Sequence, residues 1–136
     1  MTGKFPIIPE PWIFVFGSNT SGRHGAGAAR DAVLDYGAKE GVGVGLQGRS
    51  YAIPTRTIVP GKGLTTLPLE VVESYVVEFL QFARAHPEMK FWLTPVGCGF
   101  AGYKPAQMAC LFRDAPPNVR FPAEWAMYLS PGADFY

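Results

Sequence analysis

Hydrophobic and polar positions alternate along the chain in two periodicities, which predicts strands separated by helices. Continuous apolar runs at residues 12–16 and 90–94 are typical of strands buried on both faces. Between residues 68 and 86, apolar side chains recur every three or four positions, which predicts the longest helix. Pro68 stands where a first-turn proline is tolerated, and Pro87 ends this helix.

Weaker patterns predict the remaining elements. They are helices at 25–36 and 105–113 and strands at 50–53 (ended by Pro54), 57–59 and 118–121. Residues 41–48 are too rich in glycine for a regular element and are expected to form a shaped loop. The aromatic residues near the C-terminus are expected to pack on the core rather than on a partner, and they are Trp125, Tyr128, Phe135 and Tyr136. The alternation predicts one α/β domain over residues 1–136, with a proline-rich lead-in at 1–11 and a mostly parallel sheet.

Composition narrows the class of protein. Hydrophobic residues make up 48% of the chain and charged residues 17%, a balance that excludes a disordered tail. The net charge of +1 disfavours a protein that binds nucleic acid through phosphates alone. No apolar run reaches the roughly 18 residues that span a bilayer, and the N-terminus does not resemble a signal peptide. We therefore expect a soluble cytoplasmic protein without membrane contact, and two Cys and two His predict no metal site.

The first candidate site is the glycine-rich segment 17–29, which joins a predicted strand to a predicted helix. Ligands of open α/β sheets bind at the carboxyl ends of strands. Glycines let the backbone approach a ligand, and the free N–H groups at a helix start favour an anion. A plain tight turn needs fewer glycines than this segment holds. The predicted ligand-binding residues here are Ser18, Asn19, Arg23, Gly25, Ala26 and Gly27.

The second candidate site follows the predicted strand 90–94. Residues 97–102 match the pattern GxGxxG, but the acidic residue expected about 20 positions later is missing, because position 117 is proline. The segment therefore lacks the dinucleotide fingerprint and predicts no cofactor, while a backbone cradle for phosphate stays open. The predicted ligand-binding residues here are Val96, Gly97, Cys98, Gly99, Phe100, Ala101, Gly102 and Tyr103.

Three side chains are candidates for chemistry. His24 lies beside Arg23 and is a candidate acid–base group, because imidazole titrates near neutral pH. Asp31 and Asp35 are one helical turn apart and could form a carboxylate pair. The favoured alternative is that both are solvated residues on the helix surface. Cys98, between two glycines, is either a nucleophile or simply a small residue that fits the loop, and the second interpretation is favoured.

The sequence resembles a known family in three segments: GSNTSGRHGAGAA at 17–29, GRSYAIPTRT at 48–57 and LTPVGCGFAGY at 93–103. These segments lie within a match, over roughly residues 12–125, to a group of small bacterial and phage proteins of largely unassigned activity. That group is similar to a divergent branch of the macro domain family, the ADP-ribose-binding fold. The resemblance implies a three-layer macro-domain-like sandwich, with a mixed, mostly parallel central sheet and helices on both faces.

The resemblance also implies roles for single residues. Asn19 matches the asparagine that reaches the distal ribose, Gly25 to Gly27 match the loop around that ribose, and 96–103 match the loop that holds the diphosphate. In one class of macro-domain hydrolases, an Asp shortly after the glycine loop serves hydrolysis. The matching position in this sequence is about Ala28 or Ala29, and Asp31, the nearest carboxylate, lies one to two positions after it. The implied activity is ADP-ribose binding with weak or no hydrolysis, for which Asn19, His24 and Asp31 are the catalytic candidates.

Two other functions stay open at this stage. One is a non-catalytic sensor or sequestering protein for another nucleotide derivative, favoured by the missing loop Asp. The other is a nucleic-acid-associated protein, for which residues 17–63 hold six basic and three acidic side chains. The expected partner is a small ligand of the ADP-ribose type, with an ADP-ribosylated macromolecule as a further option and nucleic acid disfavoured.

Overall fold

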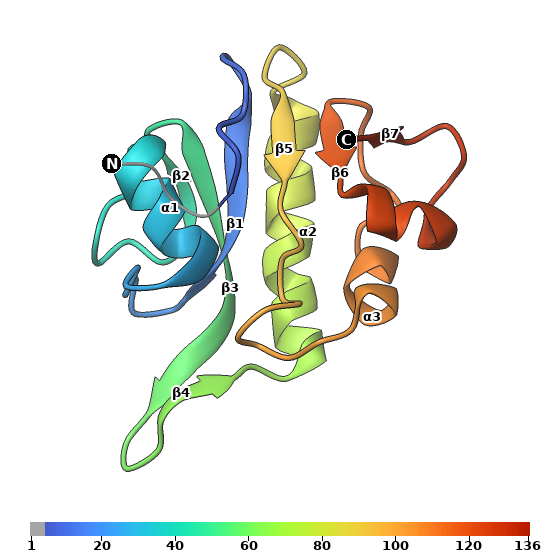
Figure 1. Cartoon of the computed structure of the whole chain (residues 1–136). Coiled ribbons are helices and arrows are strands. Elements are labelled where there is room, and N and C mark those ends of the chain that lie inside the picture. The colour runs from blue at the N-terminus through green and yellow to red at the C-terminus, as the bar shows by residue number, and fades with distance from the viewer. Residues whose placement is uncertain (1–4) are drawn as a thin grey trace.

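A computed structural model describes residues 5–136 of the chain and shows an α/β fold (Figure 1). The elements in chain order are β1 (Ile13–Asn19), α1 (Gly27–Asp35), β2 (Gly45–Gln47), β3 (Ser50–Val59), β4 (Gly63–Thr66), α2 (Leu69–Ala85), β5 (Phe91–Leu93), α3 (Pro105–Cys110), β6 (Val119–Phe121), the 3-10 helix η1 (Ala123–Tyr128) and β7 (Asp134–Phe135). The long helix expected at 68–86 is confirmed as α2, and the expected strands at 12–16, 90–94 and 118–121 are confirmed as β1, β5 and β6.

Seven strands form one mixed sheet in the order β2-β3-β1-β5-β6-β7, and β4 pairs with β3. β1 lies between two parallel neighbours, β3 and β5, and the parallel pairing continues through β6 to β7. β2 and β4 run antiparallel to β3. The carboxyl ends of β1 and β5 therefore point to the same edge of the sheet.

Alternate residues of β1 enter two different hydrophobic clusters. Ile13 and Val15 pack into the larger cluster with the apolar stripe of α2. Phe14 and Phe16 pack into a smaller cluster with residues of α1. Since successive side chains of a strand point to opposite faces, α1 and α2 cover opposite faces of the sheet (Figure 1). Within residues 5–136, no helix combines the length and apolar character needed to cross a membrane.

The sequence-based expectation for the segment before α2 was wrong in two places. The strand predicted to end at Pro54 continues to Val59, so the candidate strand 57–59 is part of β3. Pro54 lies between the part of β3 that pairs with β2 and the part that pairs with β4, so its missing N–H removes no bond from either ladder. Residues 45–47, expected to lie in a loop, form β2, because β3 offers this short segment a partner.

The aromatic residues near the C-terminus pack on the core, as expected. Trp125 is fully buried within the larger cluster, where Tyr128 and Phe135 also pack. Tyr136 stacks on Trp92 at 4.4 Å between ring centroids, and its hydroxyl donates to Leu93 O at 2.8 Å. These contacts hold η1 and β7, neither of which the sequence pattern predicted, against the last strands of the sheet.

Asn118 connects the end of α2 to the start of β6, which predicts a specific loss of stability. Its Nδ2 donates to three carbonyl oxygens, those of Ala83 at 2.9 Å, His86 at 3.1 Å and Met89 at 3.0 Å. We expect Asn118→Ala to lower the free energy of unfolding by about 1–3 kcal/mol, since these partly buried acceptors lose their donor.

The matched variant Asn118→Asp separates a hydrogen-bond effect from loss of packing. Its carboxylate has nearly the shape of the amide but faces the three carbonyl oxygens with negative charge. Urea denaturation is expected to show a larger decrease in the free energy of unfolding for Asn118→Asp than for Asn118→Ala. An equal or smaller loss would contradict the role of the amide as donor.

Candidate functional site

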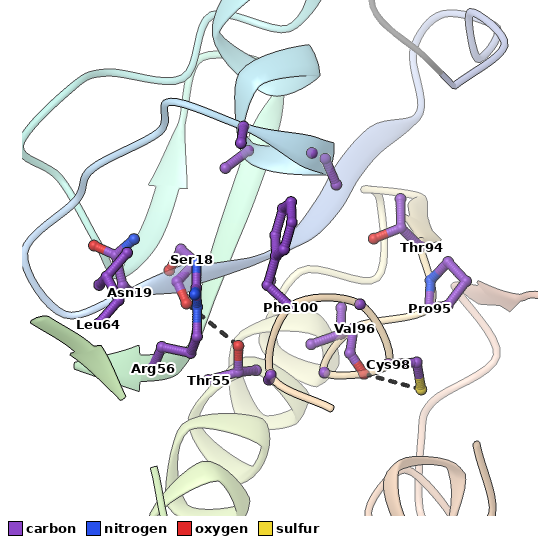
Figure 2. A pocket seen from close by; sticks show the side chains of 18 of the residues that line it. Ser18, Asn19, Thr55, Arg56, Leu64, Thr94, Pro95, Val96, Cys98 and Phe100 are labelled. Atoms are coloured by element: carbon purple, nitrogen blue, oxygen red, sulfur yellow. Dashed lines mark hydrogen bonds between the residues drawn. The ribbon is translucent and has the colours of Figure 1, made fainter. Parts of the chain in front are cut away.

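A cavity of about 640 Å³ lies at the carboxyl ends of β1 and β5 (Figure 2). Its walls come from the end of β1, the start of α1, the middle of β3 and the loop after β5. Figure 2 shows Asn19, Arg56 and Leu64 at one end of the cavity, Thr94 and Pro95 at the other, and Phe100 between them. A pocket of a few hundred Å³ between strand-end loops is the usual setting for a small ligand.

The cavity brings together most residues that the sequence predicted for a ligand site. From the first loop they are Ser18, Asn19, Arg23, Gly25, Ala26 and Gly27, and from the second they are Val96, Gly97, Cys98, Gly99, Phe100 and Ala101. Four predicted residues do not line it: His24, Asp31, Gly102 and Tyr103. The last two close the second loop instead, since Tyr103 N donates to Gly97 O at 2.9 Å and the Tyr103 hydroxyl donates to Leu67 O.

Asn19 fixes the shape of the first loop through its carboxamide. Its Nδ2 donates to Arg23 O at 2.8 Å, and its Oδ1 accepts from Arg23 N at 2.9 Å and from the Ser21 hydroxyl at 2.8 Å. Both polar atoms of this buried side chain are therefore engaged within the loop. The structure supports a positioning role for Asn19, whereas the resemblance implied direct contact with a ribose.

His24 and Asp31, two of the catalytic candidates, lie outside the cavity and hold other parts of the fold. The buried His24 ring packs edge-on against Phe16, and its Nε2 donates to Val42 O at 2.9 Å. The buried carboxylate of Asp31 accepts from Phe5 N at 2.9 Å, which ties the N-terminal segment to α1. Neither side chain presents a group to a ligand in the cavity.

Part of the glycine cluster serves chain packing. Gly22 has φ +72°, and a Cβ atom there would lie 2.3 Å from the Gly41 carbonyl carbon. A Cβ atom on Gly43 would lie 2.2 Å from Asn19 O. The loop 41–45 therefore crosses the end of β1 at a distance that only glycine permits. These glycines support the first loop from behind without lining the cavity.

Sequence reasoning missed several lining residues, of which Arg56 on β3 is the most informative. The missed residues are Phe5, Gly17, Ala28, Ala29, Thr55, Arg56, Leu64, Thr94 and Pro95. Arg56 lies opposite Asn19 in the sheet. Arg56 could have been identified from its position beside the end of β1. That position can be deduced only when β3 is known to continue past Pro54.

Phe100 joins the two sides of the cavity. Its ring is 66% exposed, yet it touches the start of α1, because a Cβ atom on Gly27 would lie 2.8 Å from Phe100 Cε2. The Arg56 guanidinium carbon lies 5.3 Å from the centroid of the same ring, within the range of a cation–π contact. The exposed aromatic ring is therefore held from two directions above the cavity (Figure 2).

The charge of the lining favours an anion. Its charged side chains, among residues 5–136, are Arg23 and Arg56, and none is a carboxylate. The cavity also includes the start of α1, where Ala26 is the N-cap and provides no side-chain hydrogen bond. Backbone N–H groups at a helix start and arginine side chains both favour negative charge. No group of three metal-ligating side chains occurs in the described part of the chain.

Cys98 is the one nucleophilic thiol in the lining, and it is poorly activated. Burial raises the pKa of this thiol to about 11, and Glu124 adds a smaller effect in the same direction. Its Sγ lies 3.7 Å from Val96 O, as a weak donor to that carbonyl. Because the thiolate is the reactive form, Cys98 is a poor nucleophile near neutral pH.

No family model, no curated protein and no solved structure matches this chain.

The raised pKa of Cys98 predicts a specific alkylation profile. In a Cys110→Ser variant, the rate of Cys98 alkylation by iodoacetamide is expected to rise about tenfold per pH unit between about pH 7 and pH 10, because only the thiolate reacts. Mass spectrometry measures the rate, and the double variant with Cys98→Ser gives the background. A rate that levels off at about pH 9, as for a thiol of ordinary pKa, would contradict the raised pKa.

Proposed function

We propose that this protein binds ADP-ribose or a related nucleotide derivative in the cavity between the two glycine-rich loops. The observation that carries the proposal is the convergence of both loops on one cavity at the ends of the parallel strands β1 and β5. Either loop alone is a weak signal. Together they supply backbone from two directions around a volume of about 640 Å³, which lies within the usual range for small-molecule and cofactor pockets.

The lining suits a diphosphate flanked by two sugars. The lining at the start of α1 (25–29) is entirely glycine and alanine, and the loop after β5 adds Gly97, Gly99 and Ala101, so backbone N–H groups can approach phosphate oxygens closely. The absence of carboxylates from the described lining removes repulsion of the phosphates. The hydroxyls of Ser18, Thr55 and Thr94 donate to backbone carbonyls, so toward a ribose they can act only as acceptors of its hydroxyl groups.

The same proposal extends to the fold. In it, the chain is a divergent macro domain, a three-layer sandwich in which α1 forms one outer layer and α2 with α3 the other. The two hydrophobic clusters on opposite faces of the sheet support this arrangement. The glycine loop between β1 and α1 and the loop after β5 then hold the two positions that the sequence resemblance implies.

Binding without efficient catalysis is the form of the function that the geometry favours. His24 and Asp31 do not line the cavity, and the Asn19 carboxamide is engaged with Arg23. The raised pKa of Cys98 keeps its thiol protonated near neutral pH. Since residues 5–136 place no general base or activated nucleophile at the cavity, hydrolysis of an ADP-ribosyl bond is expected to be weak or absent. A sensor or sequestering protein for a nucleotide derivative fits these features best.

Calorimetric titration of the purified chain with ADP-ribose, with AMP and NAD as comparators, tests the proposal. ADP-ribose is expected to bind with a micromolar Kd. Gly25→Glu is expected to weaken binding at least about tenfold, by placing a carboxylate beside the phosphates. Gly25 is the suitable position, because it lines the cavity and a Cβ atom there meets nothing within 4 Å.

Gly25→Gln is the matched control, since it adds nearly the same volume without charge. It is expected to lose less affinity than Gly25→Glu, and both variants are expected to keep the wild-type thermal midpoint. The proposal is wrong if ADP-ribose, AMP and NAD all give no binding heat and no thermal stabilisation with the wild-type chain.

A further inference from the structure

We propose that Arg23 and Arg56 form a phosphate-binding subsite at the Asn19 end of the cavity, so that the ligand carries an anionic group at that end as well. This inference rests on the proposed function and makes it more specific. The two glycine-rich loops serve the central phosphates, and the two arginines serve a further phosphate on the part of the ligand away from Thr94 and Pro95.

Both arginines are anchored through their backbones to the same few residues. Arg23 N and O bond to the two polar atoms of the Asn19 carboxamide. Arg56 lies opposite Asn19 in the sheet, and its carbonyl oxygen accepts from Thr20 N at 3.0 Å. The two side chains therefore start from a fixed frame, although 33 positions separate them along the sequence.

An irregularity in β3 turns Arg56 toward the cavity. The register of β1 with β3 shifts after Ser18, so that Pro54 pairs with Ser18 and Arg56 pairs with Asn19. Thr55 is the extra residue between them. In a regular strand, neighbouring side chains point to opposite faces, but here both Thr55 and Arg56 line the cavity. β-Bulges next to binding sites redirect side chains in this way.

Phe100 orients the Arg56 side chain within the cavity. The guanidinium carbon lies 5.3 Å from the centroid of the Phe100 ring, and the ring itself rests against Gly27. Figure 2 shows the Arg56 side chain, from β3, beside the Phe100 side chain, from the loop after β5. Stacking on an aromatic face leaves the N–H groups at the edge of the guanidinium plane available, and these groups bind phosphate oxygens in pairs.

Among residues 5–136, no carboxylate lies within 4.0 Å of the Arg23 or Arg56 guanidinium group, and the ion pair at that distance joins Arg120 and Asp134 outside the cavity lining. Two like charges beside one cavity repel each other, and an anion bound near both relieves this repulsion. A phosphate group is the ligand whose charge and geometry fit two guanidinium groups.

Nucleotides that differ by one terminal phosphate test the subsite. We would titrate the full chain with adenosine, ADP and ATP in the presence of a chelator, so that no divalent ion neutralises the phosphates. The wild-type chain is expected to bind ATP about tenfold or more tightly than ADP, as a charge-assisted hydrogen bond provides. In Arg56→Gln and in Arg23→Gln, the ratio of the two Kd values is expected to fall close to one.

Arg30→Gln is the matched control, because it removes the same charge from an exposed position on α1 outside the cavity lining. It is expected to keep the wild-type preference for ATP, whereas Arg56→Lys is expected to keep part of it. The same preference in Arg56→Gln as in the wild type would overturn the subsite, and so would an equal loss in Arg30→Gln. If Arg23→Gln and Arg56→Gln lost affinity for adenosine and for ATP by the same factor, the effect would be purely structural and the subsite would also be overturned.

Failure of the subsite and failure of the proposed function give different results. If the wild-type chain binds ADP-ribose and ADP but does not prefer ATP, the function stands and the subsite is wrong. If no nucleotide binds, pyrophosphate tests the arginines alone, and no pyrophosphate binding overturns the subsite as well. A single-stranded oligonucleotide that binds more tightly than ATP, and loses affinity in both arginine variants, would assign the arginines to nucleic acid instead.

Discussion

The parallel pairing of β1 with both β3 and β5 is the constraint on which the site depends. A strand with parallel neighbours on both sides brings their carboxyl ends to one edge of the sheet, and the loops that follow must meet there. β1 also contributes alternate side chains to both hydrophobic clusters, so its position is fixed by the two faces of the core at once. The cavity therefore lies at the end of a strand that is packed on both faces.

The glycines near this edge divide into two groups with different physical roles. Gly22 and Gly43 let the segments 19–22 and 41–45 cross at distances that a Cβ atom would forbid, and they lie behind the cavity. Gly25, Gly27 and Gly97 line it. The sequence shows only that glycines cluster, and their division depends on which segments cross in space. Of the lining glycines, Gly25 and Gly99 combine open space at Cβ with a φ outside the left-handed region, whereas Gly27 and Gly97 have positive φ.

The sequence predicted the elements that have a clear apolar pattern of their own, and it missed the short strands that depend on pairing with a neighbouring strand. α2, β1 and β5 follow from their own residues, whereas β2, β4 and β7 are short strands that exist because a neighbour offers them hydrogen bonds. The two loops of the site could also be predicted from their own residues, since glycine-rich segments at strand ends are visible in the sequence. Arg56 was not, because its role depends on a register shift between strands. His24 and Asp31 were predicted by residue type, but burial assigns them to the interior.

The arrangement of polar groups around the cavity is the basis for proposing a binding site rather than a catalytic one. The Asn19 carboxamide holds the Arg23 backbone with its oxygen and with one N–H of Nδ2, which leaves at most the second N–H for a ligand. That bond arrangement keeps the first loop in one shape, so the ligand meets a preorganised wall and loses less free energy to ordering. In the proposed function, selectivity comes from shape and charge: small residues where phosphates approach, an aromatic ring at Phe100, and positive charge at Arg56. A cavity of this kind would discriminate among ligands by where their phosphates lie.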